Sequence, residues 1–138
     1  MKDCIFCKIV NKEIPANIIA ENDKAIAFLD VSPISDGHTL IVPKNHYKDF
    51  SSTPDDVLNA VTELAKKVVG ILDKTPSLKP YGYNYLSNQG DVAGQMVFHF
   101  HLHVIPKYGK NEGFVATTVN KQLLPVKEVY DKIKSIYN

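Results

Sequence analysis

The chain has 138 residues, which suits one domain of ordinary size with its own hydrophobic core. Hydrophobic residues make up 44% and charged residues 22%, and the formal net charge of +1 indicates neither a nucleic-acid nor a membrane-surface partner. No apolar run approaches the roughly 18 residues of a membrane-spanning helix, and the N-terminus lacks a signal-peptide pattern. We therefore expect a cytoplasmic protein that forms a single domain over residues 1–138.

The chain begins with its only two cysteines, Cys4 and Cys7, at the spacing Cys-x-x-Cys. They could form a redox disulfide, be two incidental buried thiols, or supply half of a zinc site, for which this spacing is common. A thioredoxin-like motif should follow a strand inside a βαβ unit, whereas only three residues precede Cys4, so we favour zinc. Residues 6–11 are predicted to form a short helix, ended by a turn at 12–15.

Two strands are predicted at residues 18–20 and 25–30, joined by a hairpin turn at 21–24. The second strand is apolar nearly throughout, which predicts a central position in the sheet. It ends in Asp30. This acid could bind a pair of ribose hydroxyls, or it could simply cap the turn that follows.

A third strand is predicted at residues 38–43, with His38 at its start and His46 shortly after its end. A lone histidine at a strand start is usually a surface residue. The composition favours another interpretation, because the chain has five histidines and two cysteines. If zinc takes both cysteines and two histidines, three histidines remain for a second site.

The one long helix is predicted from about residue 54 to Lys74. Ser52 or Thr53 is expected to cap it, with Pro54 at the first helical position and two acids facing the positive end of the helix dipole. An apolar stripe at helical spacing should cover one face of a sheet; it consists of Val57, Leu58, Val61, Leu64, Ala65, Val68 and Leu72.

A fourth strand, at residues 83–87, is predicted to end in Asn88. The loop at 89–95 contains two glycines among small or polar residues. This composition suits backbone amides that approach an anion, although most such loops are simple turns.

Three histidines, His99, His101 and His103, then alternate with apolar residues. In a strand over residues 99–106 this pattern puts the imidazoles on one face and the core residues on the other; the latter are Phe98, Phe100, Leu102 and Val104. Because a strand rises about 3.3 Å per residue, the outer histidines would lie about 13 Å apart. This separation favours a division of the three histidines. One end of the row would bind a metal, and the other histidines would be free for acid, base or nucleophile chemistry.

The last segment is predicted to be an amphipathic helix that packs on its own domain or on a second subunit. Its apolar face consists of Val126, Val129, Tyr130, Ile133, Ile136 and Tyr137. The order of elements suggests an α+β domain with a mostly antiparallel sheet and helices on one face.

The histidine row resembles the signature of the histidine triad (HIT) superfamily. The likeness extends to residues 28–33 and 37–46, to Asn88 and to Gly94-Gln95, in the order found in the nucleotide-binding branch of that superfamily. It covers about residues 4–108, so we expect a motif-bearing core at 1–108 and a C-terminal extension at 109–138. The resemblance implies a five-stranded antiparallel sheet with one long helix, and a homodimer in which the two sheets join.

The resemblance also implies hydrolysis or transfer at the α-phosphate of nucleotides, with purine nucleoside phosphoramidates as typical substrates. His101 matches the nucleophile that forms a nucleotidyl-histidine intermediate, His103 the residue beside the phosphate, and His38 a supporting histidine. Asp30 matches the acid that binds the ribose hydroxyls. The other matched nucleotide-binding positions are Phe6, Ile14, Phe28, Val31, Asn88, Gly94 and Gln95.

Members of the superfamily with an N-terminal Cys-x-x-Cys look like zinc binders. The related uridylyltransferases imply a structural Zn²⁺ on Cys4, Cys7, His46 and His99, with no organic cofactor. One departure is Met96, where many animal members have serine, so the leaving-group preference can differ.

Two other functions stay open at this point. One is a metal-dependent hydrolase with two histidines of the row and His38 on a catalytic zinc. The other is a nucleotide-binding regulatory protein with little turnover, which would use the same residues.

Overall fold

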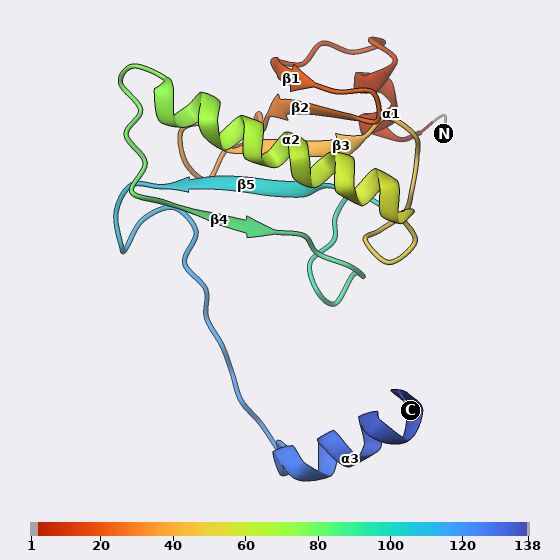
Figure 1. Cartoon of the computed structure of the whole chain (residues 1–138). Coiled ribbons are helices and arrows are strands. Elements are labelled where there is room, and N and C mark those ends of the chain that lie inside the picture. The colour runs from red at the N-terminus through yellow and green to blue at the C-terminus, as the bar shows by residue number, and fades with distance from the viewer. Residues whose placement is uncertain (1–2, 138) are drawn as a thin grey trace.

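The computed structural model describes residues 3–137, within which five strands form one antiparallel sheet in the order β1-β2-β3-β5-β4 (Figure 1). The elements are α1 (Ile5–Val10), β1 (Ile18–Glu21), β2 (Ala25–Leu29), β3 (Thr39–Pro43), α2 (Asp55–Lys74), β4 (Gly82–Leu86), β5 (Leu102–Lys107) and α3 (Val126–Tyr137). The predicted α+β fold with a five-stranded antiparallel sheet and one long helix is confirmed, and β2 is an inner strand as expected.

The sheet is covered on both faces because β2 and β3 are apolar on both sides. One face packs against α2 through Ala25, Ala27 and Ile41. The other face packs against Phe6 and Ile9 of α1 through Ile26, Phe28, Leu40 and Val42. The expectation that the helices lie on one face is therefore wrong: two strands without a polar face need cover on both sides.

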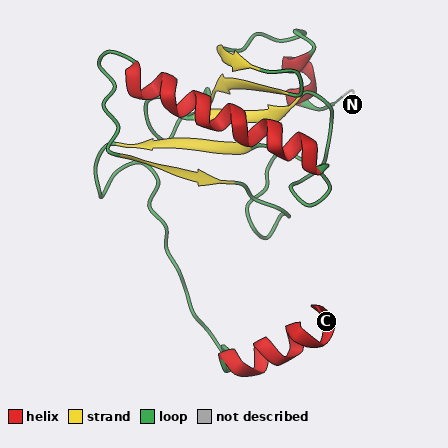
Figure 2. Ribbon diagram, viewed as in Figure 1, coloured by secondary structure: helices red, strands yellow, loops and turns green. Residues whose placement is uncertain are grey.

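The helix α2 lies across the sheet (Figure 2) and buries the apolar stripe that its periodicity predicts. Its predicted cap is wrong, because the helix begins at Asp55 and Pro54 occupies the N-cap position. The hydroxyl of Thr53 donates instead to the carbonyl of Asp49 at 2.6 Å. The hydroxyl of Ser52 donates to the Asp49 carboxylate at 2.7 Å, so the turn before the helix uses both candidate caps.

The strand β5 begins at Leu102, so the strand predicted from residue 99 starts too early. Before it, the amide of Phe100 donates to the carbonyl of Tyr47 at 2.6 Å, in the loop after β3. From residue 100 on the alternation holds, since Phe100, Leu102 and Val104 all pack in the core beneath α2. Phe98 does not belong to that core, because its side chain is 43% exposed.

The helix α3 has the predicted amphipathic pattern, yet none of its residues is buried. It stands apart from the sheet at the end of an extended segment (Figure 1). The division into a core at 1–108 and an extension at 109–138 stays a prediction. Among residues 3–137, no helix combines the length and apolar character needed to cross a membrane.

The α2 face of the sheet should carry much of the free energy of folding. Ile41 is fully buried there, so Ile41→Ala should lower the free energy of unfolding by about 2–5 kcal/mol through lost burial and a residual cavity. Urea denaturation measures this change. Val92→Ala, at a fully exposed side chain, is the control and should stay within about 0.5 kcal/mol of the wild type. Equal effects of the two substitutions would contradict this account of the core.

Candidate functional site

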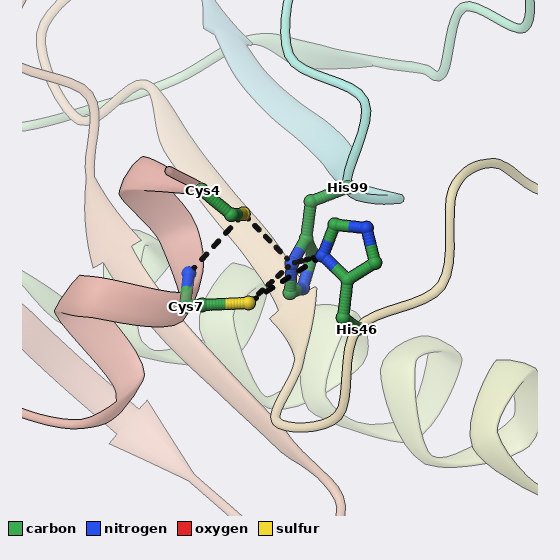
Figure 3. A group of neighbouring side chains, drawn as sticks. All are labelled: Cys4, Cys7, His46 and His99. Atoms are coloured by element: carbon green, nitrogen blue, oxygen red, sulfur yellow. Dashed lines mark hydrogen bonds between the residues drawn. The ribbon is translucent and has the colours of Figure 1, made fainter. Parts of the chain in front are cut away.

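The N-terminal part of α1 and two loops bring four side chains together, as Figure 3 shows: Cys4, Cys7, His46 and His99. Cys4 and Cys7 flank the first turn of α1, and no disulfide joins them. His46 comes from the loop after β3, and His99 from the segment before β5. One ligand atom of each lies within 4.8 Å of all the others, so these four residues could hold a metal ion.

The spacing of these ligand atoms fits a tetrahedral centre. Zinc bonds of about 2.0–2.1 Å to nitrogen and about 2.3 Å to sulfur put two tetrahedral nitrogen ligands about 3.3 Å apart and a nitrogen and a sulfur ligand about 3.5 Å apart. Here the Nδ1 atom of His99 lies 3.3 Å from Cys4 Sγ and 3.5 Å from Cys7 Sγ. The Nδ1 atom of His46 lies 3.4 Å from Cys7 Sγ and 3.2 Å from His99 Nδ1.

The hydrogen bonds of His99 prepare its Nδ1 atom as a ligand. The Nε2 atom lies 2.9 Å from the carbonyl oxygen of Pro43, and a carbonyl only accepts, so Nε2 carries the hydrogen. The Nδ1 lone pair then faces the cysteines. Burial lowers the pKa of His99 to about 4, which keeps the imidazole in the neutral form that binds metals. Burial lowers the pKa of His46 as well.

The second histidine of the row has a different fixed tautomer. The Nδ1 atom of His101 lies 2.8 Å from the carbonyl oxygen of His99, so Nδ1–H donates and Nε2 keeps its lone pair. The imidazole packs against Phe6 with ring centroids 5.0 Å apart. Burial lowers the pKa of His101, against the opposing effects of the His99 carbonyl and the Asp30 carboxylate. The result is a neutral imidazole with one free nitrogen.

His103 and His38 form a hydrogen-bonded pair next to His101. The amide of Ile34 donates to His38 Nδ1 at 3.1 Å, so His38 carries its hydrogen on Nε2. That Nε2–H faces His103 Nδ1 at 2.9 Å and leaves the hydrogen of His103 on its own Nε2. Burial lowers the pKa of His38, and burial together with the two neighbouring histidines lowers the pKa of His103 to about 4.

Asp30 has two partners, one for each carboxylate oxygen. Its Oδ1 atom accepts from the amide of Ser32 at 2.8 Å, which is the turn-capping role that the sequence offered as one alternative. Its Oδ2 atom lies 3.6 Å from His38 Nε2, so its charge faces the histidines.

A cavity of about 560 Å³ lies in front of these groups, a size typical of sites for small ligands. His101 and His103 line it, whereas His38 is buried behind them. Asp30 and most of the other predicted nucleotide-binding residues also line it, namely Phe6, Ile14, Phe28, Val31, Asn88 and Gly94.

Gln95 is the predicted nucleotide-binding residue that does not line the cavity. Its side chain is 3% exposed and bonds to the backbone of two loops. The amide of Gly90 donates to its Oε1 at 2.9 Å, and its Nε2 donates to the carbonyl of Lys48 at 2.7 Å. Gln95 therefore shapes the 88–97 loop, which contributes Asn88 and Gly94 to the cavity.

Several lining residues escaped the sequence analysis. Leu40 pairs with Phe28 across β2 and β3 and so lies on the same face, a relation that only the strand register reveals. The other missed residues are Ile5, Ile9, Pro15, Ala16, Leu29, Ser32 and Val97. Met96 also lines the cavity and is 89% exposed.

A family model described as the HIT domain matches residues 11–110. An uncharacterised HIT-like protein of Mycoplasma genitalium is 54% identical over 123 residues, which cover 88% of this chain and 86% of that protein. The adenosine 5′-monophosphoramidase of Schizosaccharomyces pombe is 37% identical over 137 residues, which cover 95% of this chain and 98% of that protein.

Solved structures agree with this family. A HIT family protein from Bacillus anthracis superposes with a TM-score of 0.87 at 35% identity, covering 98% of this chain and 95% of that one. A zinc-bound histidine triad family protein from Mycobacterium smegmatis superposes with a TM-score of 0.76 at 31% identity, covering 86% of this chain and 85% of that one.

The four-ligand cluster generates a prediction about metal content. Wild-type protein purified with zinc should hold about one ion per chain, and the double variant Cys4→Ser, Cys7→Ser should hold none, because hydroxyls replace two thiolate ligands. Elemental analysis measures the content. His103→Asn is the control, since His103 is outside the cluster, and it should keep its ion. A double variant that retains the metal would contradict this assignment.

The low pKa of His103 predicts a loss of stability in acid. Between about pH 6.5 and about pH 4 the unfolded chain binds a proton that folded His103 does not, so the free energy of unfolding falls as the pH drops. His103→Asn removes this group and should reduce the fall. Urea denaturation at pH 7 and pH 5, on both proteins with the same metal content, isolates His103. If the free energy of unfolding depends on pH identically in the wild type and in His103→Asn, the low pKa of His103 is not the cause.

Proposed function

Because the chain belongs to the HIT domain family, we propose that it is a nucleotide hydrolase that cleaves purine nucleoside phosphoramidates at the α-phosphate. The observation that carries the proposal is the neutral His101, whose Nε2 lone pair is fixed beside the cavity. The name of the Schizosaccharomyces pombe relative, an adenosine 5′-monophosphoramidase, supports the choice of substrate.

In the proposed mechanism, the Nε2 atom of His101 attacks the α-phosphorus in line. A bond forms between phosphorus and Nε2, and the bond between phosphorus and the departing amine breaks as that amine takes a proton from solvent, which the attacking water returns in the second step. Water then cleaves the nucleotidyl-histidine, releasing the mononucleotide and restoring His101. The covalent step divides one difficult displacement into two easier ones.

The pair of His38 and His103 supports the phosphate in this proposal. The amide of Ile34 sets the tautomer of His38, which in turn leaves a hydrogen on Nε2 of His103. That N–H is available to a phosphoryl oxygen as negative charge develops in a partly dry site. Both imidazoles are neutral because burial lowers their pKa values.

The cavity suits the rest of a nucleotide. We assign the base to the apolar wall formed by Phe6, Ile14, Phe28 and Val31. We assign the ribose hydroxyls to Asp30, which lines the cavity; its Oδ1 accepts from the Ser32 amide at 2.8 Å, whereas its Oδ2 lies 3.6 Å from His38 Nε2. Asn88 and the backbone at Gly94 complete the phosphate side of the cavity.

The metal-dependent alternative conflicts with the tautomer of His38. Asp30, His38 and His103 lie close enough to hold an ion. Binding through His38 Nε2 would require the hydrogen to move to Nδ1, where the amide of Ile34 already donates. Two N–H groups would then face each other, which disfavours a catalytic metal at this group.

The proposal includes a structural Zn²⁺ held by Cys4, Cys7, His46 and His99, a donor set that zinc prefers. When bound there, the ion supplies a cross-link between α1 and two loops rather than a reactive position. We also propose a homodimer that joins the sheets through β4, which lies at one edge of the sheet, where a strand can pair with another chain. A cytoplasmic location and the absence of nucleic-acid and membrane partners remain part of the proposal.

The covalent step is tested with an adenosine 5′-phosphoramidate. Intact-mass measurement after brief mixing and acid-free quenching should detect one nucleotidyl group on the wild type and none on His101→Ala. The variant should lose at least about 10²–10⁴-fold in turnover. Nucleotide binding by His101→Ala, measured by calorimetry, is the control that its cavity is intact.

Two outcomes would replace this mechanism. Turnover without an adduct, abolished by a chelator while the chain stays folded, would favour the metal-dependent hydrolase. Saturable nucleotide binding without adduct or turnover would favour the regulatory protein.

A further inference from the structure

We propose that the Cys4–Cys7–His46–His99 cluster orients the nucleophile, with His99 and Phe6 as the positioning residues that connect it to His101. This inference rests on the proposed function, in which His101 attacks phosphorus. It assigns the cluster a part in the reaction beyond holding the fold together. Two independent sets of contacts carry it.

The first connection runs through His99 itself. Its carbonyl oxygen accepts the hydrogen bond that fixes His101 Nδ1–H, at 2.8 Å. Residues 99–101 precede β5, so strand hydrogen bonds do not hold this carbonyl. Its peptide unit is held by the Phe100 amide, which donates at 2.6 Å to the carbonyl of Tyr47, the residue next to the ligand His46. The His99 side chain is fully buried and is held at Nε2 by the carbonyl of Pro43. A metal on Nδ1 would hold the other side of the ring and so fix the residue that orients His101.

The second connection runs through α1. This helix has only six residues, too few to be stable by itself. Phe6 and Ile9 pack it against the sheet, and Cys4 and Cys7 at its N-terminal part would tie it to the cluster. Phe6 lies between the two cysteines. Its ring centroid is 5.0 Å from that of His101 and 5.8 Å from that of His99, in both cases edge to face. Phe6 therefore packs on the nucleophile from the same short helix that supplies both thiols.

The position of the cluster separates this role from general stability. The main core lies beneath α2, on the opposite face of the sheet from α1. Loss of the metal should therefore disturb α1 and the side chains of His99 and His101, while the α2 core, which includes Phe100, stays packed. Because the lining of the cavity includes Phe6, KM should rise, and because His101 loses its fixed orientation, kcat should fall about 10–100-fold.

The experiment compares zinc-loaded, chelator-treated and zinc-reloaded wild-type protein. Nitrogen-15 NMR of the imidazoles should show a His101 Nδ1–H protected by its carbonyl partner in the loaded protein. In the metal-free protein that signal should be lost while methyl signals of the α2 core persist, and zinc should restore it. Turnover of an adenosine 5′-phosphoramidate, with kcat and KM determined separately, is measured on the same samples.

Val68→Ala is the matched control for loosening of the fold. Val68 is a fully buried residue of α2, on the opposite face of the sheet from α1, so this variant loses stability without touching α1. With zinc bound, it should keep the His101 signal and the wild-type kcat. If metal removal unfolds the wild type, cadmium-loaded protein replaces it, since longer metal–ligand bonds should shift the His101 signal relative to zinc.

The possible failures are distinct. An unchanged His101 signal in folded metal-free protein, or the same signal with cadmium as with zinc, would overturn the positioning role. Loss of the signal in Val68→Ala would overturn it too, by showing that any loss of stability has this effect. Absence of turnover in the loaded wild type would instead reject the proposed function, while the NMR signal would still decide the orientation of His101.

Discussion

The site depends on one hydrogen bond, from Nδ1–H of His101 to the carbonyl of His99. An imidazole has two nitrogens, and a nucleophile must present the one without the hydrogen. A carbonyl partner settles this choice, since it accepts and never donates. The same constraint recurs at His99, where the carbonyl of Pro43 takes the Nε2 hydrogen, and at His38, where the amide of Ile34 occupies the Nδ1 lone pair. Backbone groups thus select all three tautomers.

The sheet divides stability and chemistry between its faces. The side beneath α2 holds a continuous apolar core that includes the fully buried Ile41 and Val68. The side beneath α1 carries the histidines, the cavity and the cysteines. A short helix leaves the cavity more open to a ligand than a long one would. A helix of this length is not stable by itself. Phe6 and Ile9 pack this helix against the sheet, and the four-ligand cluster at its N-terminal part would add a second attachment.

Local patterns in the sequence predicted most of the helices and strands. They did not predict the contacts between segments that are far apart in the sequence. A continuous apolar run identified β2, and alternation identified the shared facing of His101 and His103, because both are properties of a single strand. Alternation could not locate the start of β5, since Phe100 pairs with Tyr47 in a distant loop. Phe98 looked like core for the same reason and is exposed. The four ligands and most of the cavity residues were named through family resemblance, whereas Leu40 required the register of β2 against β3. The buried role of Gln95 depends on Gly90 and Lys48, a contact that no local pattern encodes.

Burial ties these features together. Three histidines and a carboxylate within a few ångströms could share protons in many ways in water. Burial lowers the pKa values of His38, His101 and His103, so all three imidazoles are neutral near pH 7. With the protons removed, each ring has one donor and one acceptor, and the backbone leaves a single consistent arrangement. In the proposed mechanism, this arrangement would offer a lone pair from His101 and a donor from His103 to the phosphate, which is what attack on an anionic centre requires.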